Sequence, residues 1–327
     1  MQGFAAVAPF LLICLAASQQ PGAGVSSSDE HRSSSNGVPP SQSADGLLPT
    51  WTDAEKRVWQ SAKPYLDENI FDLEKEVPEL KGLTPAASQE ELNSILGGVG
   101  ARCVDLLKRT PNVIADEQVS TYVSHFMSSE QEFSYLVIVN QTDQGSIVRE
   151  YRTDARGTPV SEPGGSWGQG FALMWAHFFP ATQPESRFRY LGTQRIDNQE
   201  VMVVAFAQIP EQVTMPAEFT VAGARISILY QGIAWIDPAS KRILRMREDL
   251  LAPRPDAKLT RFTAKVRYGA VVVKKAEAAV PQDANLWLPR QADLDWNLAG
   301  QAGGERHTYS NYRLYVVKSR LVFSLDP

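Results

Sequence analysis

The chain has 327 residues, a formal net charge of -5 and a hydrophobic fraction of 43%. This is enough apolar material for one large core or two modest ones. The acidic balance argues against sequence-independent binding of nucleic acid, which needs surplus Lys and Arg to displace phosphate counterions. The sequence also has no long Lys/Arg block that would attract the chain to an anionic membrane.

The first residues have the pattern of an export signal. Residues 4–17 form an apolar run that is too short to span a membrane, and Ala16-Ala17-Ser18 provides a small-residue cleavage sequence. We therefore expect residues 1–18 to be a signal peptide. The mature chain is expected to be periplasmic or secreted, with no integral membrane span. Cleavage would remove Cys14 and leave Cys103 as a single cysteine, so no internal disulfide is expected.

Residues 19–50 are rich in Ser, Pro, Gly and Gln and poor in apolar side chains. Such a segment cannot bury enough surface to offset its chain entropy, so we expect a disordered tether. Folding should begin near Trp51.

Residues 51–113 are predicted to form an N-terminal helical segment. Thr52 and Glu55 have the spacing of a capping box, and a second short amphipathic helix is expected at about residues 67–76.

The clearest helix is predicted to start at Ser88, with Glu91 completing another capping box. Apolar residues follow at a spacing of three to four, and Cys103 lies on that stripe. A buried core thiol is therefore expected. The three glycines at positions 97, 98 and 100 weaken the helix and allow another element to pack closely against it.

Residues 114–327 are predicted to form a curved antiparallel β domain, because the apolar period changes to two from about residue 118. The expected strands are 119–127, 133–140, 147–152, 188–196, 201–208, 226–236, 242–249, 259–273, 286–296 and 306–325. Turns are expected at 128–130, 197–198 and 237–240, and a short helix at 171–179. Strands that follow one another through turns favour an antiparallel meander, so the fold class is α+β, with helices packed on a large curved sheet.

Motifs for catalysis are weak in this sequence. Gly164 to Gly168 matches the G-x-S-x-G pattern around Ser166, but Pro163 argues against the buried strand that a nucleophile elbow requires. The histidines do not have zinc-ligand spacing, and no metal or cofactor is expected. Asp293 and Asp295 should share one face of a strand, where they are interpreted as a solvated edge. The chain is therefore not expected to be an enzyme, and a serine hydrolase that uses Ser166 is a remote alternative.

Two segments carry a family resemblance. The sequence from Gly192 to Ala205, and the Trp235-Ile236-Asp237-Pro238 segment followed by Ile243 to Met246, resemble the periplasmic lipoprotein-carrier LolA and sigma-regulator RseB superfamily. The resemblance implies an unclosed β-barrel capped by helices, with an opening that holds acyl chains or senses lipoproteins. The helical opening with Gly-Leu-Thr-Pro at 82–85 is also similar to a family of exported bacterial proteins without assigned function.

The expected function is that of an exported, non-enzymatic binding protein, a carrier or sensor of lipid or acyl groups in the cell envelope. Its partner would be a lipid or an acylated protein. The alternative is an envelope scaffold or protein-interaction module. Alternation places Met202, Val204 and Phe206 on one face, and Leu229, Ile233 and Trp235 share another. These six residues are the ligand-cavity candidates, although ordinary core packing would select the same residues.

Overall fold

The structure is a computed structural model that describes residues 5–7, 12–14, 51–124, 126–142, 145–160, 170–221, 224–273 and 285–315. Most of the expected signal peptide, the expected tether, Ser166 and the chain after residue 315 lie outside the described residues. The described α-helices are α1 (Asp53–Gln60), α2 (Ile70–Glu76) and α3 (Leu92–Arg109), and the 3₁₀ segments are η1 (Pro78–Leu80), η2 (Phe171–Phe178), η3 (Gln183–Glu185) and η4 (Pro255–Ala257).

The strands form one large antiparallel sheet and one small sheet. The strands are β1 (Ala5–Val7), β2 (Leu12–Cys14), β3 (Thr84–Pro85), β4 (Val113–Val123), β5 (Phe126–Thr142), β6 (Gly145–Thr153), β7 (Ser186–Ile196), β8 (Gln199–Gln208), β9 (Ala217–Val221), β10 (Ala224–Ile228), β11 (Tyr230–Ile236), β12 (Ile243–Leu250), β13 (Leu259–Val272), β14 (Asn285–Leu298) and β15 (Gln301–Leu314).

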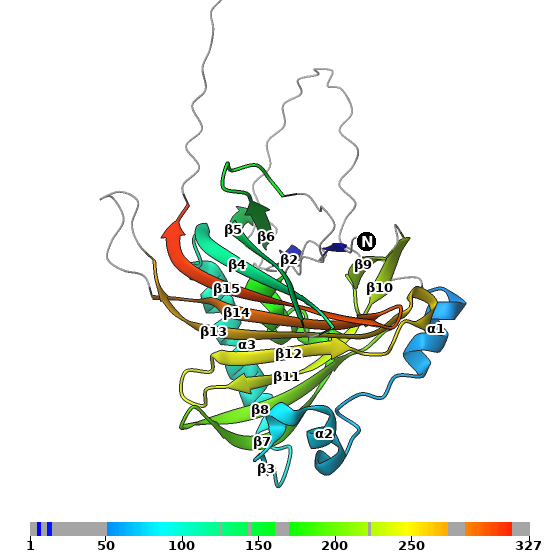
Figure 1. Cartoon of the computed structure of the whole chain (residues 1–327). Helices are drawn as coiled ribbons and strands as arrows, with labels where there is room; N and C mark the ends of the chain where they lie inside the picture. The colour runs from blue at the N-terminus through cyan, green and yellow to red at the C-terminus, as the bar shows by residue number, and fades with distance from the viewer. Residues whose placement is uncertain are drawn as a thin grey trace, which may run out of the picture.

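Twelve of the described strands make the large sheet, in the order β2-β6-β5-β4-β15-β14-β13-β12-β11-β8-β7-β3 (Figure 1). Strands β1, β9 and β10 make the small one. Among the described residues the two end strands of the large sheet do not pair with each other, so the sheet stays open. The predicted fold class, a large unclosed antiparallel sheet with helices packed on it, is confirmed.

The large sheet buries side chains on both faces. We call the face that carries α3 and η2 the inner face, and the face that carries α1, α2 and η1 the outer face (Figure 1). Strand β8 shows the alternation, because Val204 packs in the inner cluster while its neighbours Val203 and Ala205 pack in the outer one. Its pattern therefore reads as a continuous apolar run, as expected for a strand covered on both sides.

Several local predictions are confirmed. Thr52 caps α1 in a capping box with Glu55. The turn between β7 and β8 has both Asp197 and Asn198 in the left-handed region, as a two-residue hairpin turn requires. Close packing against α3 is also found, since a Cβ at Gly100 would lie 2.9 Å from Gln183 Nε2 and 3.2 Å from the carbonyl oxygen of Phe178.

The predicted capping box at Ser88 and Glu91 is wrong. Helix α3 begins at Leu92, its N-cap is Glu91, and no side chain caps it. The reason is a tertiary contact: the Gln89 amide both donates to the Tyr190 carbonyl and accepts from the Tyr190 N–H, each at 2.8 Å. This pairing with β7 holds residues 89–91 outside the helix.

One predicted break between strands is misplaced, and the structure contains one break that the sequence did not predict. The turn expected at 128–130 is wrong, because Ser129 and Glu130 pair with β4, and the chain reverses after Val123, where Ser124 has a left-handed φ of 49°. The single strand expected over 226–236 is wrong as well. It is divided at Leu229 into β10 of the small sheet and β11 of the large one. The apolar run through this position contains no local signal for the division.

The last strand begins earlier than predicted. Ala299 and Gly300 have φ values of 50° and 79°, which makes a tight turn, and β15 starts directly after it at Gln301. Strand β15 then pairs with β4, which brings together the first and the last of the long strands that the structure describes. This pairing joins two sequential meanders into one sheet.

Candidate functional site

The six cavity candidates from the sequence do not line one space. Met202, Val204 and Phe206 belong to the inner cluster, where Phe206 stacks on His177 with ring centroids 4.5 Å apart. Leu229, Ile233 and Trp235 belong to the outer cluster beneath α1, α2 and η1. All six are 6% exposed or less. Of the six, Trp235 also borders the hollow described next.

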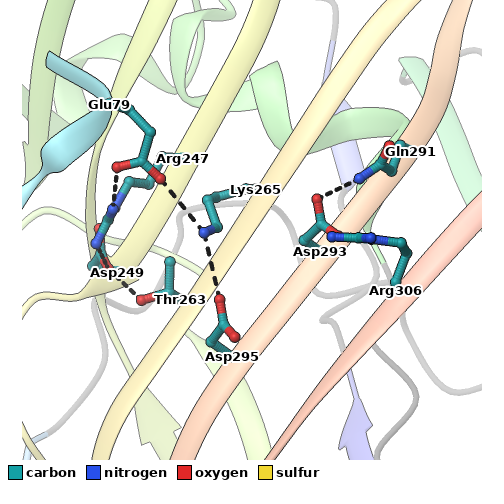
Figure 2. A network of polar contacts seen from close by, with 9 residues as sticks. All are labelled: Glu79, Arg247, Asp249, Thr263, Lys265, Gln291, Asp293, Asp295 and Arg306. Carbon is teal, nitrogen blue, oxygen red and sulfur yellow. Dashed lines mark hydrogen bonds and ion pairs between the residues drawn. The ribbon is translucent and has the colours of Figure 1, made fainter. Parts of the chain in front are cut away.

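A polar trough of about 550 Å³ crosses the outer face of the sheet beside η1. Strands β12, β13, β14 and β15 provide most of its floor, and Glu79 of η1 stands at its edge (Figure 2). Ile196, Trp235 and Tyr122 provide apolar and aromatic surface. The trough is lined by the cations Arg245, Arg247, Arg261, Lys265, Arg267 and Arg306 and by the carboxylates Glu79, Asp293 and Asp295. We refer to this hollow as the outer trough.

The buried side chain of Gln194 fixes the position of Glu79. The Gln194 amide on β7 donates to the carbonyl oxygens of Glu79 and Lys81, at 2.8 and 2.9 Å. It also accepts from Trp235 Nε1 at 2.8 Å. Gln194 therefore ties the short η1 turn to the sheet, and so holds the Glu79 carboxylate at the trough.

Arg247 is the fixed centre of the network (Figure 2). Its guanidinium donates to both carboxylate oxygens of Asp249, at 2.6 and 2.9 Å, and to Glu79 at 2.8 Å. Asp249 is held in turn by the Thr263 hydroxyl at 2.6 Å. Burial lowers the pKa of Arg247, but its hydrogen bonds to Asp249 and the nearby carboxylates outweigh burial, and the pKa lies above the usual value.

The two other cations of the network differ in how closely their carboxylate partners approach: the ion pairs of Lys265 are longer than that of Arg306. Lys265 Nζ lies 3.4 Å from Glu79 and 3.4 Å from Asp295. Arg306 donates to Asp293 at 2.6 Å, and this hydrogen bond raises the pKa of Arg306. Burial alone would raise the pKa of Glu79, but the charge of Arg247 holds it below its usual value, so Glu79 stays ionised.

A second group of charges lies on the inner face and is closed to solvent. Glu117 accepts from Arg152 at 2.5 and 2.8 Å and contacts His307 Nδ1 at 2.8 Å, while the other His307 ring nitrogen lies 3.3 Å from Glu305. Burial lowers the pKa of His307, but its hydrogen bonds to the two glutamates prevail, so the pKa is raised. We call these four residues the inner ionic cluster. Its charges are paired in the way that buried ions require.

The other sequence candidates are accounted for as follows. Cys103 is buried, as expected, and its burial raises the pKa of the thiol. Asp293 and Asp295 do share one face, but they lie on a central strand and line the outer trough, so their interpretation as a solvated edge is wrong. Within the described residues, no group of three His, Cys, Asp or Glu side chains is placed to hold a metal ion. In the same part of the chain, no helix is both long and apolar enough to cross a membrane.

The outer trough was missed at the level of sequence. The sequence signal for it is a basic residue at every second position of two neighbouring strands: Arg245 and Arg247 on one, Lys265 and Arg267 on the other. This pattern marks a polar face, but strand register decides whether the two rows meet, and register is a property of the folded sheet.

Three solved structures are similar to this chain at 10–12% sequence identity. No protein-family profile and no curated protein matches the chain. A DUF1329 family protein from Desulfovibrio piger is similar in structure with a TM-score of 0.35 and 10% identity, covering 69% of this chain and 94% of its own. An outer membrane lipoprotein-sorting protein domain from Vibrio parahaemolyticus has a TM-score of 0.34, 12% identity and coverages of 67% and 91%. A LolA superfamily protein from Nitrosomonas europaea has a TM-score of 0.32, 10% identity and coverages of 68% and 94%. At this level of similarity the neighbours assign no family, no ligand and no site residue to this chain.

Proposed function

We propose that this chain is an exported, non-enzymatic binding protein of the cell envelope, and that its ligand occupies the outer trough. The observation that carries the proposal is the trough itself, a hollow of about 550 Å³ with charged side chains held in place by η1 and four strands. This volume is within the range of about 300–1,000 Å³ that is common for ligand pockets. A lipid or a lipid-modified protein, the partner class expected from the sequence, would present its polar head here.

A second candidate is carriage of an acyl chain within the inner face. The observation that favours it is η2, a 3₁₀ segment with a break in its dihedral angles at Leu173 and a left-handed Gly170 at its start. Hydrogen bonds of 3₁₀ geometry are poorer than those of an α-helix. Outward movement of η2 would expose apolar wall, because Phe171, Trp175 and Phe178 pack inward.

Native mass spectrometry can test both candidates. The chain would be expressed in a periplasm, purified without detergent, and measured before and after organic extraction. We compare the wild type with Ala302→Trp, which fills the trough, and with Ala270→Trp, a control on an exposed position of β13 outside its lining. The proposal predicts an adduct that extraction removes, that Ala302→Trp loses and that Ala270→Trp keeps.

The other outcomes are equally informative. A lipid adduct that survives in Ala302→Trp would reject the trough and favour the inner face. If all three proteins have the mass of the polypeptide without an adduct, both small-ligand proposals are rejected and the protein-interaction alternative is favoured. Crosslinking would then search for a protein partner.

A further inference from the structure

Like charges lie directly opposite one another on two neighbouring strands of the outer trough. In the register of β12 and β13, Arg245 lies directly opposite Arg267, and Arg247 lies directly opposite Lys265. All four line the trough and so face the same side of the sheet. Like charges at directly opposed positions destabilise a strand pair. We call these four residues the cation block.

The nearby carboxylates neutralise some cations of the block and not others. Arg245 pairs with Asp197 at the rim, and Arg247 and Lys265 share Glu79 while also contacting Asp249 and Asp295, respectively. Arg267 is exposed and has no ion pair with any residue that the structure describes, and the same holds for Arg261 farther along β13. On the neighbouring strand β14, Asp293 lies directly opposite Lys265 in register, but it is paired with Arg306 at 2.6 Å. The excess positive charge is therefore concentrated beside Arg245 and Arg267.

The side chains of the block differ in freedom. Arg247 is 9% exposed and fixed by two carboxylates, so it supplies charge without moving. Arg245 and Arg267 are more exposed, and among the described residues Arg245 pairs with Asp197 alone and Arg267 has no ion pair. Lys265 lies 3.4 Å from each of its two carboxylate partners. Guanidinium forks match the oxygen geometry of phosphate, and an ammonium adds a compact charge.

We propose that the cation block, Arg245, Arg247, Lys265 and Arg267, binds a phosphate-bearing ligand in the outer trough. This inference rests on the proposed function and names the ligand chemistry of the same site. Arg245 and Arg267 donate hydrogen bonds to the phosphate oxygens, and Lys265 turns toward these oxygens from Glu79. Arg247 contributes its positive charge from a fixed position. The phosphate can belong to a phospholipid head or to a small soluble ester.

Titration calorimetry of the full mature chain tests the proposal with three probes: inorganic phosphate, glycerol 3-phosphate, and phosphatidylcholine vesicles with or without phosphatidylglycerol. Arg267→Gln is the informative variant, because Arg267 has no ion pair in the described fold whose loss would destabilise it. The matched control is Arg109→Gln, which removes the same charge from an exposed position on α3. Glu79→Gln removes the carboxylate that competes for Arg247 and Lys265.

We expect Arg267→Gln to weaken binding by about tenfold or more, Arg109→Gln to leave it unchanged and Glu79→Gln to strengthen it. Affinity should fall as salt is added. Binding of the soluble probes would identify a free phosphate ester as sufficient. Binding confined to phosphatidylglycerol vesicles, with the same dependence on Arg267, would identify a lipid head.

The inference is overturned if no probe binds, if Arg109→Gln weakens binding as much as Arg267→Gln, or if poly-glutamate binds and phosphate does not. Failure here is separable from failure of the proposed function. An adduct that Ala302→Trp loses, without any phosphate binding, would keep the trough as the ligand site and reject its phosphate chemistry.

Discussion

At the scale of single residues, the inner ionic cluster places paired charges in the interior of the protein. The side chains of Glu117 and Arg152 are 0% and 4% exposed, so neither charge can be satisfied by water. Removing one partner of such a pair leaves an uncompensated buried charge, which costs about 3–5 kcal/mol. The cluster is thus expected to make the joined β4–β15 region intolerant of single polar changes.

The substitution Glu117→Gln should lower the free energy of unfolding by about 3–5 kcal/mol at neutral pH. The pKa of Glu117 is lowered from 4.5 to about 2, because the charge of Arg152 and the hydrogen bond with His307 outweigh burial. A carboxylate with a depressed folded pKa stabilises the protein above its unfolded pKa, and this contribution is lost as the pH falls through the folded pKa. The contribution of the Glu117 charge to this difference should therefore be fully present just above pH 4.5 and shrink as the pH falls from 4.5 to 2.

Urea denaturation across this pH range measures the difference directly, because the other carboxylates titrate in both proteins. Glu218→Gln is the control, since Glu218 is 42% exposed and pairs with a surface arginine, and its loss should change stability by less than about 1 kcal/mol. A difference between Glu117→Gln and wild type that stays constant down to pH 2 would show that the charge of Glu117 does not stabilise the fold.

At the scale of elements, β11 packs so closely between β8 and β12 that position 232 has no room for a side chain. A Cβ at Gly232 would lie 2.0 Å from the Arg247 carbonyl oxygen and 2.7 Å from the Phe206 ring. Gly232→Ala should therefore force the neighbouring strand or ring to shift, and lower stability by about 1–3 kcal/mol.

Gly97→Ala is the matched control, because nothing lies within 4 Å of a Cβ at this helical glycine. In α3 the same added methyl group should stabilise the protein by up to about 1 kcal/mol through helix propensity. Chemical denaturation of both variants compares one substitution in two elements. Equal effects of the two changes would contradict the close packing of β11.

The elements that sequence could predict are those with local causes. The turn at Asp197 and Asn198 depends on residues that tolerate left-handed dihedral angles, and the cap of α1 depends on Thr52 and Glu55 three residues apart. Ser88 shows the limit, because a contact between Gln89 and Tyr190, 101 residues apart, determines where α3 begins. The outer trough is subject to the same limit, since Arg245 and Arg267 become neighbours through strand register.

At the scale of the whole molecule, the sheet is a two-sided layer, and the described helical elements cover part of the width of its outer face. Helices α1 and α2 with η1 pack against β7, β8 and β11. The outer trough lies on the strands beyond them. The cover is attached by buried polar contacts as well as apolar ones. The Gln231 side chain accepts from the Tyr65 backbone N–H at 2.7 Å, and Trp51 Nε1 donates to the Pro210 carbonyl at 2.8 Å. The N-terminal helical segment is therefore both part of the core and one wall of the trough.

A chain that begins at residue 88 should fail to fold to a monomer, whereas a chain that begins at residue 51 should unfold cooperatively. Loss of residues 51–87 would expose Val203, Ile233 and Trp235, which are now 3% exposed or less. Their burial contributes about 25 cal/mol per Å² of apolar surface, and an exposed apolar sheet face favours aggregation. Size-exclusion chromatography and urea denaturation of the two chains measure the outcome. A chain from residue 88 that is monomeric and as stable as the chain from residue 51 would show that the helical segment is not part of the core. The placement of Glu79 at the edge of the trough would then be wrong.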